Sequence, residues 1–249
     1  MMRGILAAAG AALVGGAVAK VALRGPAAKP ADTPLAPLVL PAGVVVREEL
    51  GRRPGPLVVV LHGANDNEGQ LVPSLASVDA HKIYVRGFLP AGKGFQWLKS
   101  RILKTPEPEF LRELEATGAR LALLVRSMKA QRGASSVVVA GFSQGGHLAW
   151  YLAARGVVDG AAIASGALPR SFAVPRPSRK VLLRYVSGVE DKTVPWEFVR
   201  TTADRFRDAG YEVLGRQLDA GHSLSRVGSD FSRTLDQALV RLADSGAER

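Results

Sequence analysis

Hydrophobic residues along this chain follow two patterns that alternate. Short continuous apolar runs, such as Leu57–Leu61 and 137–140, are typical of strands that are buried on both faces of a parallel sheet. Between such runs, apolar positions recur at helical spacing, most clearly over 110–128. The same patterns predict strands at 44–46, 83–85, 160–165, 181–186 and 211–218, and helices at 145–154, 196–209 and 231–242.

This alternation predicts an α/β fold with an open, mostly parallel central sheet and helices on both faces. Sheets of this kind bind ligands at the carboxyl ends of their strands. We therefore expect the chemistry just after the strands that end at Leu61, Ala140, Val186 and Leu218, where polar or glycine-rich segments follow.

The N-terminal residues differ from the rest of the chain. A basic start at Arg3 precedes an uncharged run rich in Ala and Gly, and Ala17-Val18-Ala19 has the spacing that signal peptidase reads. We predict an export signal at 1–19, with an uncleaved membrane anchor as the alternative, and hence a periplasmic, secreted or membrane-anchored protein. Repeated prolines predict a linker at 20–41, before one folded domain at 42–249.

Composition excludes several classes of protein. The 249 residues include no cysteine, which excludes a disulfide framework, a thiol nucleophile and a Cys-ligated metal. The four histidines show no metal-ligand spacing, so neither a metal nor a cofactor is expected. The formal net charge of +11 is spread along the chain rather than gathered in a block, so no nucleic-acid partner is expected.

The strongest chemical signal is the segment GFSQGG at 141–146. A G-x-S-x-G pattern between a buried strand and a helix is typical of a nucleophilic serine on a sharp turn, where side chains at the flanking positions would collide. Ser143 is the candidate nucleophile, and the N–H of Gln144 at the helix start is a candidate donor to an oxyanion. The turn after Leu61 is expected to supply a second N–H, that of Ala64.

A catalytic serine of this kind requires an acid and then a base further along the chain. Among the histidines, only His222 follows a candidate acid. Asp191 lies a few residues after the strand that ends at Val186, with Glu190 and Asp219 as rival carboxylates.

Other polar residues are interpreted as structural. His62 is expected to hold the loop that it starts, His81 to lie in a solvated loop, and His147 to pack against the sheet. Asp66 and its two polar neighbours are interpreted as the start of a helix.

Together these segments resemble the α/β-hydrolase fold, and within it the phospholipase/carboxylesterase family that includes acyl-protein thioesterases. The resemblance spans 42–242 and rests on GFSQGG at 141–146, HGANDNE at 62–68, GVEDKTVP at 188–195 and AGH at 220–222, in the family's order. It implies that Ser143 is the nucleophile, His222 the base and Asp191 its orienting acid. It also implies that Ala64 and Gln144 donate their backbone N–H groups to the oxyanion.

The resemblance extends to the substrate side of the site. Phe95-Gln96-Trp97 is similar to the family's aromatic segment, so Phe95 and Trp97 are predicted substrate contacts. The surrounding residues 94–103 form either a wall of the cleft or a surface helix. The loop after His62 reads Ala64-Asn65-Asp66 where relatives often have a further glycine, which concerns the shape of the acyl pocket more than the mechanism.

The predicted function is that of a serine esterase of the carboxylesterase or lysophospholipase type, which forms an acyl-enzyme. The expected partner is a small-molecule or lipid ester, with peripheral membrane association left open. An export signal argues against a lipidated cytosolic protein as the substrate. The alternatives are a depolymerase of phenolic esters or polyesters, a serine peptidase on the same fold, and a non-catalytic binding protein, which would be expected to have lost a triad residue.

Overall fold

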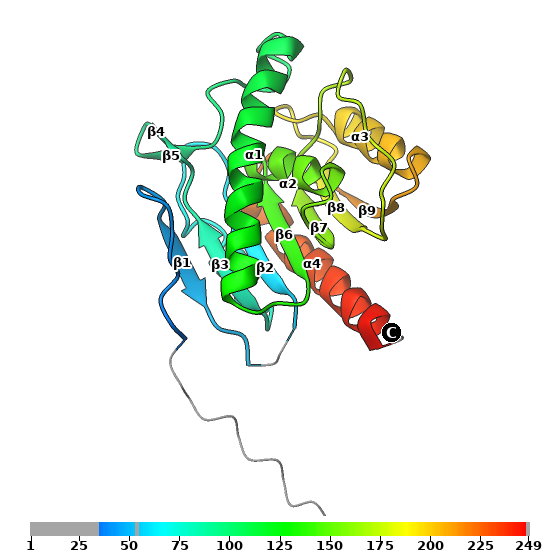
Figure 1. Ribbon diagram of the computed structural model, residues 1–249. Coiled ribbons are helices and arrows are strands. Elements are labelled where there is room, and N and C mark those ends of the chain that lie inside the picture. Colours follow the sequence, from blue (N-terminus) through cyan, green and yellow to red (C-terminus); the bar gives the residue numbers. More distant parts are fainter. Residues whose placement is uncertain (1–34, 53–54, 248–249) are drawn as a thin grey trace, which may run out of the picture. The chain divides into compact units, whose positions relative to one another are not determined.

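The structure is a computed structural model that describes residues 35–52 and 55–247 (Figure 1). By its contacts the chain divides into two units, Met1–Pro37 and Leu38–Arg249. The predicted export signal, and the predicted linker as far as residue 34, lie outside the described residues. In the part of the chain that is described, no helix is long and apolar enough to cross a membrane.

A seven-stranded sheet forms the centre of the unit Leu38–Arg249. Its strand order is β1-β3-β2-β6-β7-β8-β9; β1 runs antiparallel to β3, and all other neighbours are parallel. This confirms the predicted mostly parallel sheet. The strands are β1 (Val46–Glu49), β2 (Leu57–Leu61), β3 (His81–Val85), β6 (Val137–Phe142), β7 (Gly160–Ala164), β8 (Leu182–Gly188) and β9 (Glu212–Leu218).

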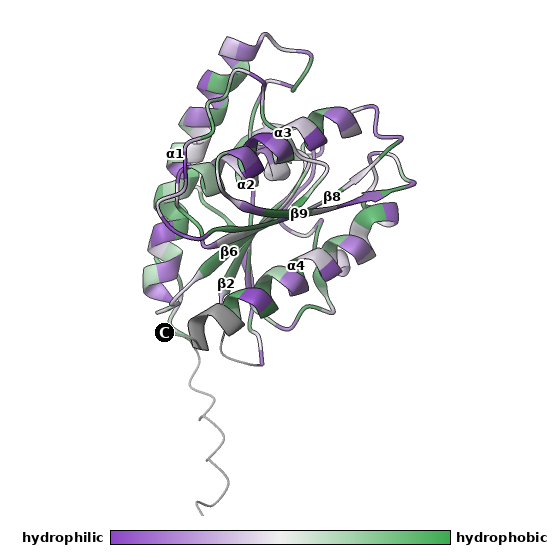
Figure 2. Ribbon diagram, turned by 90° about the vertical axis from the view of Figure 1, so that its right-hand side faces the viewer, coloured by the Kyte–Doolittle hydropathy of each residue, from purple (hydrophilic) through white to green (hydrophobic). Residues whose placement is uncertain are grey.

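Helices cover both faces of this sheet (Figure 2). One face carries α1 (Glu107–Gln131), α2 (Gln144–Ala154) and α3 (Trp196–Asp208), which share one hydrophobic core with the sheet. The other face carries α4 (Leu224–Ala247), with a second core beneath it. These three layers form the α/β-hydrolase fold.

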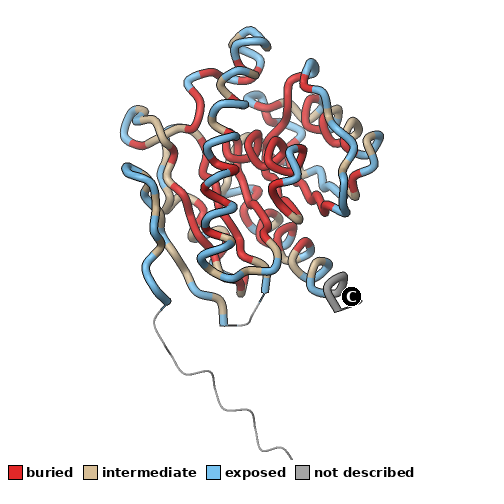
Figure 3. Tube along the Cα trace, in the orientation of Figure 1, coloured by how far each residue is buried: buried red, intermediate tan, exposed pale blue. Residues whose placement is uncertain are grey.

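The central strands are rigidly enclosed between the two helix layers. Every residue of β2, β6, β7 and β8 is buried (Figure 3). Burying one Val or Leu side chain contributes about 1.5–3 kcal/mol, so these runs stabilise the sheet strongly. Their carboxyl ends are therefore fixed points from which loops can present side chains.

Two predicted helices differ from the structure. Helix α4 starts at Leu224, seven residues before the predicted start at 231, because serines and Gly228 dilute the apolar pattern of its first turns. No helix starts at Asp66, whose backbone instead pairs with that of Phe95 through N···O distances of 3.1 and 2.7 Å.

The structure also differs from the surface helix, one of the two alternatives for residues 94–103, and from the solvated loop predicted for His81. Residues 94–103 form no surface helix: β5 (Gly94–Gln96) pairs with β4 (Leu89–Ala91) in a hairpin, and an irregular segment follows. His81 does not lie in a solvated loop but starts β3, where its Nε2 lies 2.6 Å from Oε1 of Glu48. The contact between His81 and Glu48 could not be predicted because the two residues are distant in sequence.

Candidate active site

Ser143 lies on a sharp turn between β6 and α2. Its backbone has φ 53° and ψ −115°, a conformation that residues with a side chain rarely adopt. A Cβ at Gly141 would lie 2.2 Å from the carbonyl oxygen of Gly145, and a Cβ at Gly145 would lie 2.1 Å from that of Leu61. The structure thus confirms why the flanking positions are glycine, and the turn presents Ser143 at the carboxyl edge of the sheet.

The structure brings Ser143, His222 and Asp191 together from three separate strand ends. Nε2 of His222 lies 2.9 Å from Oγ of Ser143, and Nδ1 lies 2.7 Å from Oδ2 of Asp191. The Asp191 side chain is fully buried, whereas 19% of the His222 side chain is exposed. The rival carboxylates, Glu190 and Asp219, are both exposed.

The environment of Asp191 keeps its carboxylate ionised. Its Oδ1 accepts hydrogen bonds from the N–H groups of Thr193 (2.9 Å) and Val194 (2.8 Å). Burial raises the pKa of Asp191, but these bonds and the one to His222 outweigh it, so the pKa lies below its ordinary value of 3.8. An ionised carboxylate can only accept, so Nδ1 of His222 carries the proton and Nε2 is free to accept the serine proton.

The imidazole of His222 is also held by an aromatic contact. The ring of Phe142 lies 5.0 Å from that of His222, centroid to centroid, with an angle of 32° between their planes. Phe142 ends β6, next to Ser143. This contact was not predicted, because the middle positions of G-x-S-x-G are variable in type and carry no signal of their own.

Hydrogen bonds fix the loop that carries Ala64. Nδ1 of His62 donates to the carbonyl oxygen of Gly63 (2.6 Å), and its Nε2 accepts from the N–H of Gly87 (2.7 Å). Burial lowers the pKa of His62, which keeps the ring neutral and suited to both bonds. The N–H of Gly63 donates to Oε1 of Gln70 at 2.7 Å. Ala64 therefore follows a rigid turn at the edge of the sheet that also carries Ser143.

The side chain of Gln144 has a structural role that sequence reasoning missed. Its Oε1 accepts hydrogen bonds from the N–H groups of Trp97 (3.0 Å) and Leu98 (3.3 Å), and its Nε2 donates to the carbonyl oxygen of Leu98 (2.9 Å). The side chain thus ties the segment after β5 to the start of α2. Its backbone N–H belongs to the first residue of α2, where no intrahelical acceptor exists.

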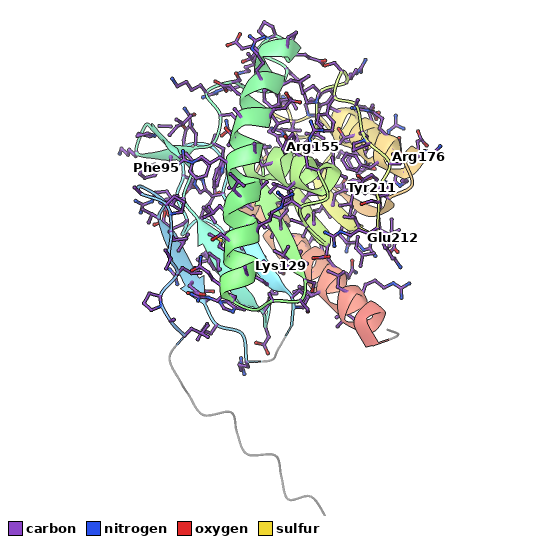
Figure 4. All side chains as sticks on the ribbon, viewed as in Figure 1. Phe95, Lys129, Arg155, Arg176, Tyr211 and Glu212 are labelled. Carbon is purple, nitrogen blue, oxygen red and sulfur yellow. The ribbon has the colours of Figure 1, made fainter. Side chains whose placement is uncertain are left out.

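The two aromatic residues predicted to contact substrate are placed differently. Trp97 is 1% exposed, and its Nε1 donates to the carbonyl oxygen of His62 at 2.9 Å, so it supports the loop and offers substrate almost no surface. Phe95 lies on the β4–β5 hairpin (Figure 4), with the guanidinium of Arg86 4.7 Å from its ring centre.

A cavity of about 170 Å³ lies between α1, α3 and the loops that follow β5 and β7. Among its lining residues, the ring of Phe110 packs edge-on against that of His147, with 5.7 Å between centroids. His147 in turn lies one helical turn after Ser143, to whose carbonyl oxygen its N–H donates at 3.0 Å. The cavity is lined by Ile102, Leu103, Thr105, Glu107, Phe110, Pro169 and Phe198.

His147 is a buried histidine that is neutral in the folded protein. Burial lowers its pKa from 6.5 to about 4, and its Nδ1 accepts a hydrogen bond from the N–H of Ala167 at 3.0 Å. As the pH falls from 6.5 toward 4, the unfolded chain takes up a proton that the folded protein does not. The free energy of unfolding should therefore fall by up to about 1.4 kcal/mol per pH unit in this window. At higher pH the contribution of His147 should no longer change with pH.

Urea unfolding of the wild type and of His147→Asn between pH 7.5 and 4.5 measures this contribution. Asn keeps an acceptor for Ala167 but does not titrate, so its deficit in unfolding free energy relative to wild type should shrink as the pH falls. A deficit that stays constant across this range would show that His147 is not the titrating group.

No group of three or more His, Cys, Asp or Glu side chains that could hold a metal ion occurs in the described part of the chain. Fold and site together define a protein of the α/β-hydrolase class. The sequence profile of the phospholipase/carboxylesterase family matches residues 96–231, and the chain belongs to this family, whose members are ester hydrolases. No curated protein sequence matches the chain.

Solved structures of esterases share the fold. The Bacillus cereus carboxylesterase is 17% identical, with a TM-score of 0.69 over 80% of this chain and 96% of that one. A carboxylesterase from Mesorhizobium loti is 23% identical, with a TM-score of 0.62 over 73% and 87%. Zea mays acyl-protein thioesterase 2 is 18% identical, with a TM-score of 0.56 over 77% and 99%.

Proposed function

We propose that this protein is a serine esterase that hydrolyses short-chain carboxylic esters through an acyl-enzyme. The observation that carries this proposal is the hydrogen-bonded chain from Ser143 through His222 to the buried carboxylate of Asp191. Membership of an esterase family supports it independently. A binding protein that had lost catalysis would have no reason to keep this geometry.

In the first half of the reaction, Oγ of Ser143 attacks the ester carbonyl carbon while Nε2 of His222 takes the serine proton. The carbonyl oxygen becomes an oxyanion, which accepts hydrogen bonds from the N–H groups of Ala64 and Gln144. The ester C–O bond then breaks, and His222 gives its proton to the departing alcohol. Ser143 is left as an ester of the acyl group.

In the second half, water takes the place of the alcohol. His222 removes a proton from the water as its oxygen attacks the acyl carbon, and the same two N–H groups stabilise the second oxyanion. Breakdown releases the carboxylic acid, and His222 returns the proton to Oγ of Ser143. Asp191 remains ionised throughout, since its charge is what stabilises the imidazolium.

The cavity beside His147 is the proposed acyl site. Apolar side chains such as Ile102, Phe110 and Phe198 form most of its wall, as in pockets that hold hydrocarbon. A protein cavity of about 150 Å³ holds one benzene molecule. The cavity volume of about 170 Å³ therefore suits an acyl group of about six carbons.

Hydrolysis of p-nitrophenyl esters from acetate to palmitate tests the function. We expect turnover with a maximum near butanoate or hexanoate, and a decline in kcat/KM for acyl chains longer than about eight carbons, because those chains exceed the cavity. A kcat/KM that keeps rising to palmitate would contradict this acyl site. Absence of turnover on every ester by folded protein would contradict the esterase itself.

A further inference from the structure

A second cavity, of about 230 Å³, lies between the edge strand β9 and α4, and no residue of the proposed mechanism lines it. It is larger than the acyl cavity, whose volume is about 170 Å³. Helix α4 packs on β7 and β8 but leaves the neighbouring face of β9 largely exposed. The cavity is therefore a groove that follows the last strand of the sheet.

Alternate residues of β9 point into this groove. Val213 joins the core on the opposite face of the sheet, and Gly215 lies against the ring of Tyr185 on that same face. Successive residues of a strand point to opposite faces, so Leu214 and Arg216 face the groove, and both line it. Leu214 is 60% exposed, and the Arg216 side chain is 58% exposed. An accessible apolar side chain thus lies beside an accessible guanidinium.

Two arginines in the groove share one carboxylate. Nη1 of Arg216 lies 3.0 Å and Nη1 of Arg233 lies 2.8 Å from the same oxygen, Oδ1 of Asp230. Each guanidinium has five N–H donors, and those not used on Asp230 have no partner in the described part of the chain. Asp230 therefore holds two cations side by side and neutralises only one of their charges.

A third arginine lines the groove beside Leu214, with which Arg184 is in register on the neighbouring strand. Nη2 of Arg184 donates to Oε1 of Glu212 at 2.7 Å, and Nζ of Lys180 lies 3.1 Å from Oε2 of the same carboxylate. Glu212 is thus shared by two cations, as Asp230 is. The groove and its rim carry an excess of positive charge, which favours an anionic ligand.

We propose that this groove binds a phosphate monoester, with the phosphate between Arg216 and Arg233 and the organic substituent over Leu214. A phosphate monoester carries nearly two negative charges at pH 7.5, because its second pKa is about 6. Guanidinium groups bind phosphate oxygens through paired N–H···O bonds. A cavity of about 150 Å³ holds one benzene molecule, so the groove has room for a phosphate and part of its substituent.

Isothermal titration calorimetry of the full-length protein at pH 7.5 tests this proposal, with phenyl phosphate as the probe. Phenyl phosphate should bind about threefold or more tightly than inorganic phosphate, because its ring covers Leu214. It should bind at least about tenfold more tightly than benzoate, which has the same ring but a single charge. Absence of phenyl phosphate binding at millimolar concentration, or equal binding of benzoate, would overturn the proposal.

Charge-changing variants locate the bound phosphate. Arg216→Gln and Arg233→Gln should each weaken binding at least about tenfold, since a hydrogen bond to a charged group is lost. Asp230→Asn keeps an acceptor for both arginines but removes the negative charge beside the phosphate, so it should tighten binding about threefold or more. Arg200→Gln is the control, because Arg200 is an exposed arginine that also contacts two carboxylates but lies on α3. Unchanged affinity in Arg216→Gln and Asp230→Asn would place the phosphate elsewhere and overturn the proposal.

Vesicles distinguish a lipid ligand from a soluble one. Phosphatidic acid presents a phosphate monoester at a membrane surface, so co-sedimentation is measured with phosphatidylcholine vesicles that contain or lack it. Binding that requires both phosphatidic acid and Arg216 assigns the phosphate to a lipid, whereas binding of phenyl phosphate without vesicle binding assigns it to a soluble molecule. Ester hydrolysis plays no part in these measurements, so their failure would leave the esterase proposal intact.

Discussion

Replacing Ser143 by Ala should abolish ester hydrolysis, with a fall in kcat on the order of 10⁵ to 10⁶. Removing the nucleophile of a serine hydrolase has an effect of this size because the acyl-enzyme can no longer form. Ala has the same backbone requirements as Ser at the positive φ of this turn, so the fold and the neighbouring N–H groups should remain in place. KM for any residual turnover should change little.

Steady-state hydrolysis of p-nitrophenyl butanoate, with protein concentration checked by absorbance, measures this loss. Ser225→Ala is the matched control, because Ser225 is an exposed serine three residues after His222 and outside the triad. The control should keep wild-type kcat within about twofold, as surface substitutions usually do. Activity of Ser143→Ala within tenfold of wild type would show that another group attacks the ester.

Replacing Asp191 by Asn should lower kcat by about 10³–10⁴ without unfolding the protein. The amide oxygen of Asn can still accept the N–H groups of Thr193 and Val194, so the loop keeps its shape. The amide nitrogen then faces Nδ1 of His222 and donates to it. This forces the imidazole proton onto Nε2. A protonated Nε2 can no longer accept the proton of Ser143.

The neighbouring carboxylate supplies the control for Asp191→Asn. Glu190 is exposed and adjacent in sequence, so Glu190→Gln removes the same charge without touching His222. It should leave kcat within about twofold of wild type. If Glu190→Gln or Asp219→Asn lowered kcat as much as Asp191→Asn, the geometric assignment of the orienting acid would be wrong.

Much of the fold could be predicted because its central strands are apolar on both faces. In a chain with alternating helices, the run LVVVL of β2 and the apolar run that begins β6 predict strands buried on both faces. The start of α4 was predicted too late because the first turns of this helix are polar and contain Gly228. The β4–β5 hairpin was missed because each of its strands has only three residues and β4 contains Pro90.

The candidate site also has a part that the sequence predicts and a part that only the structure shows. The motif around Ser143 is local, so sequence alone identifies it, and chain order singles out His222. The side-chain bonds of Gln144 to Trp97 and Leu98, and the ring contact of Phe142 with His222, depend on how distant segments meet.

The central claim is that Ser143 is a nucleophile activated by His222, and covalent labelling tests it most directly. Diethyl p-nitrophenyl phosphate should transfer its diethylphosphoryl group to Oγ of Ser143 with loss of p-nitrophenolate, giving one adduct by intact-protein mass spectrometry and one modified peptide containing Ser143. Asp191→Asn should react far more slowly. Absence of an adduct on active protein, or an adduct on a residue other than Ser143, would contradict the claim.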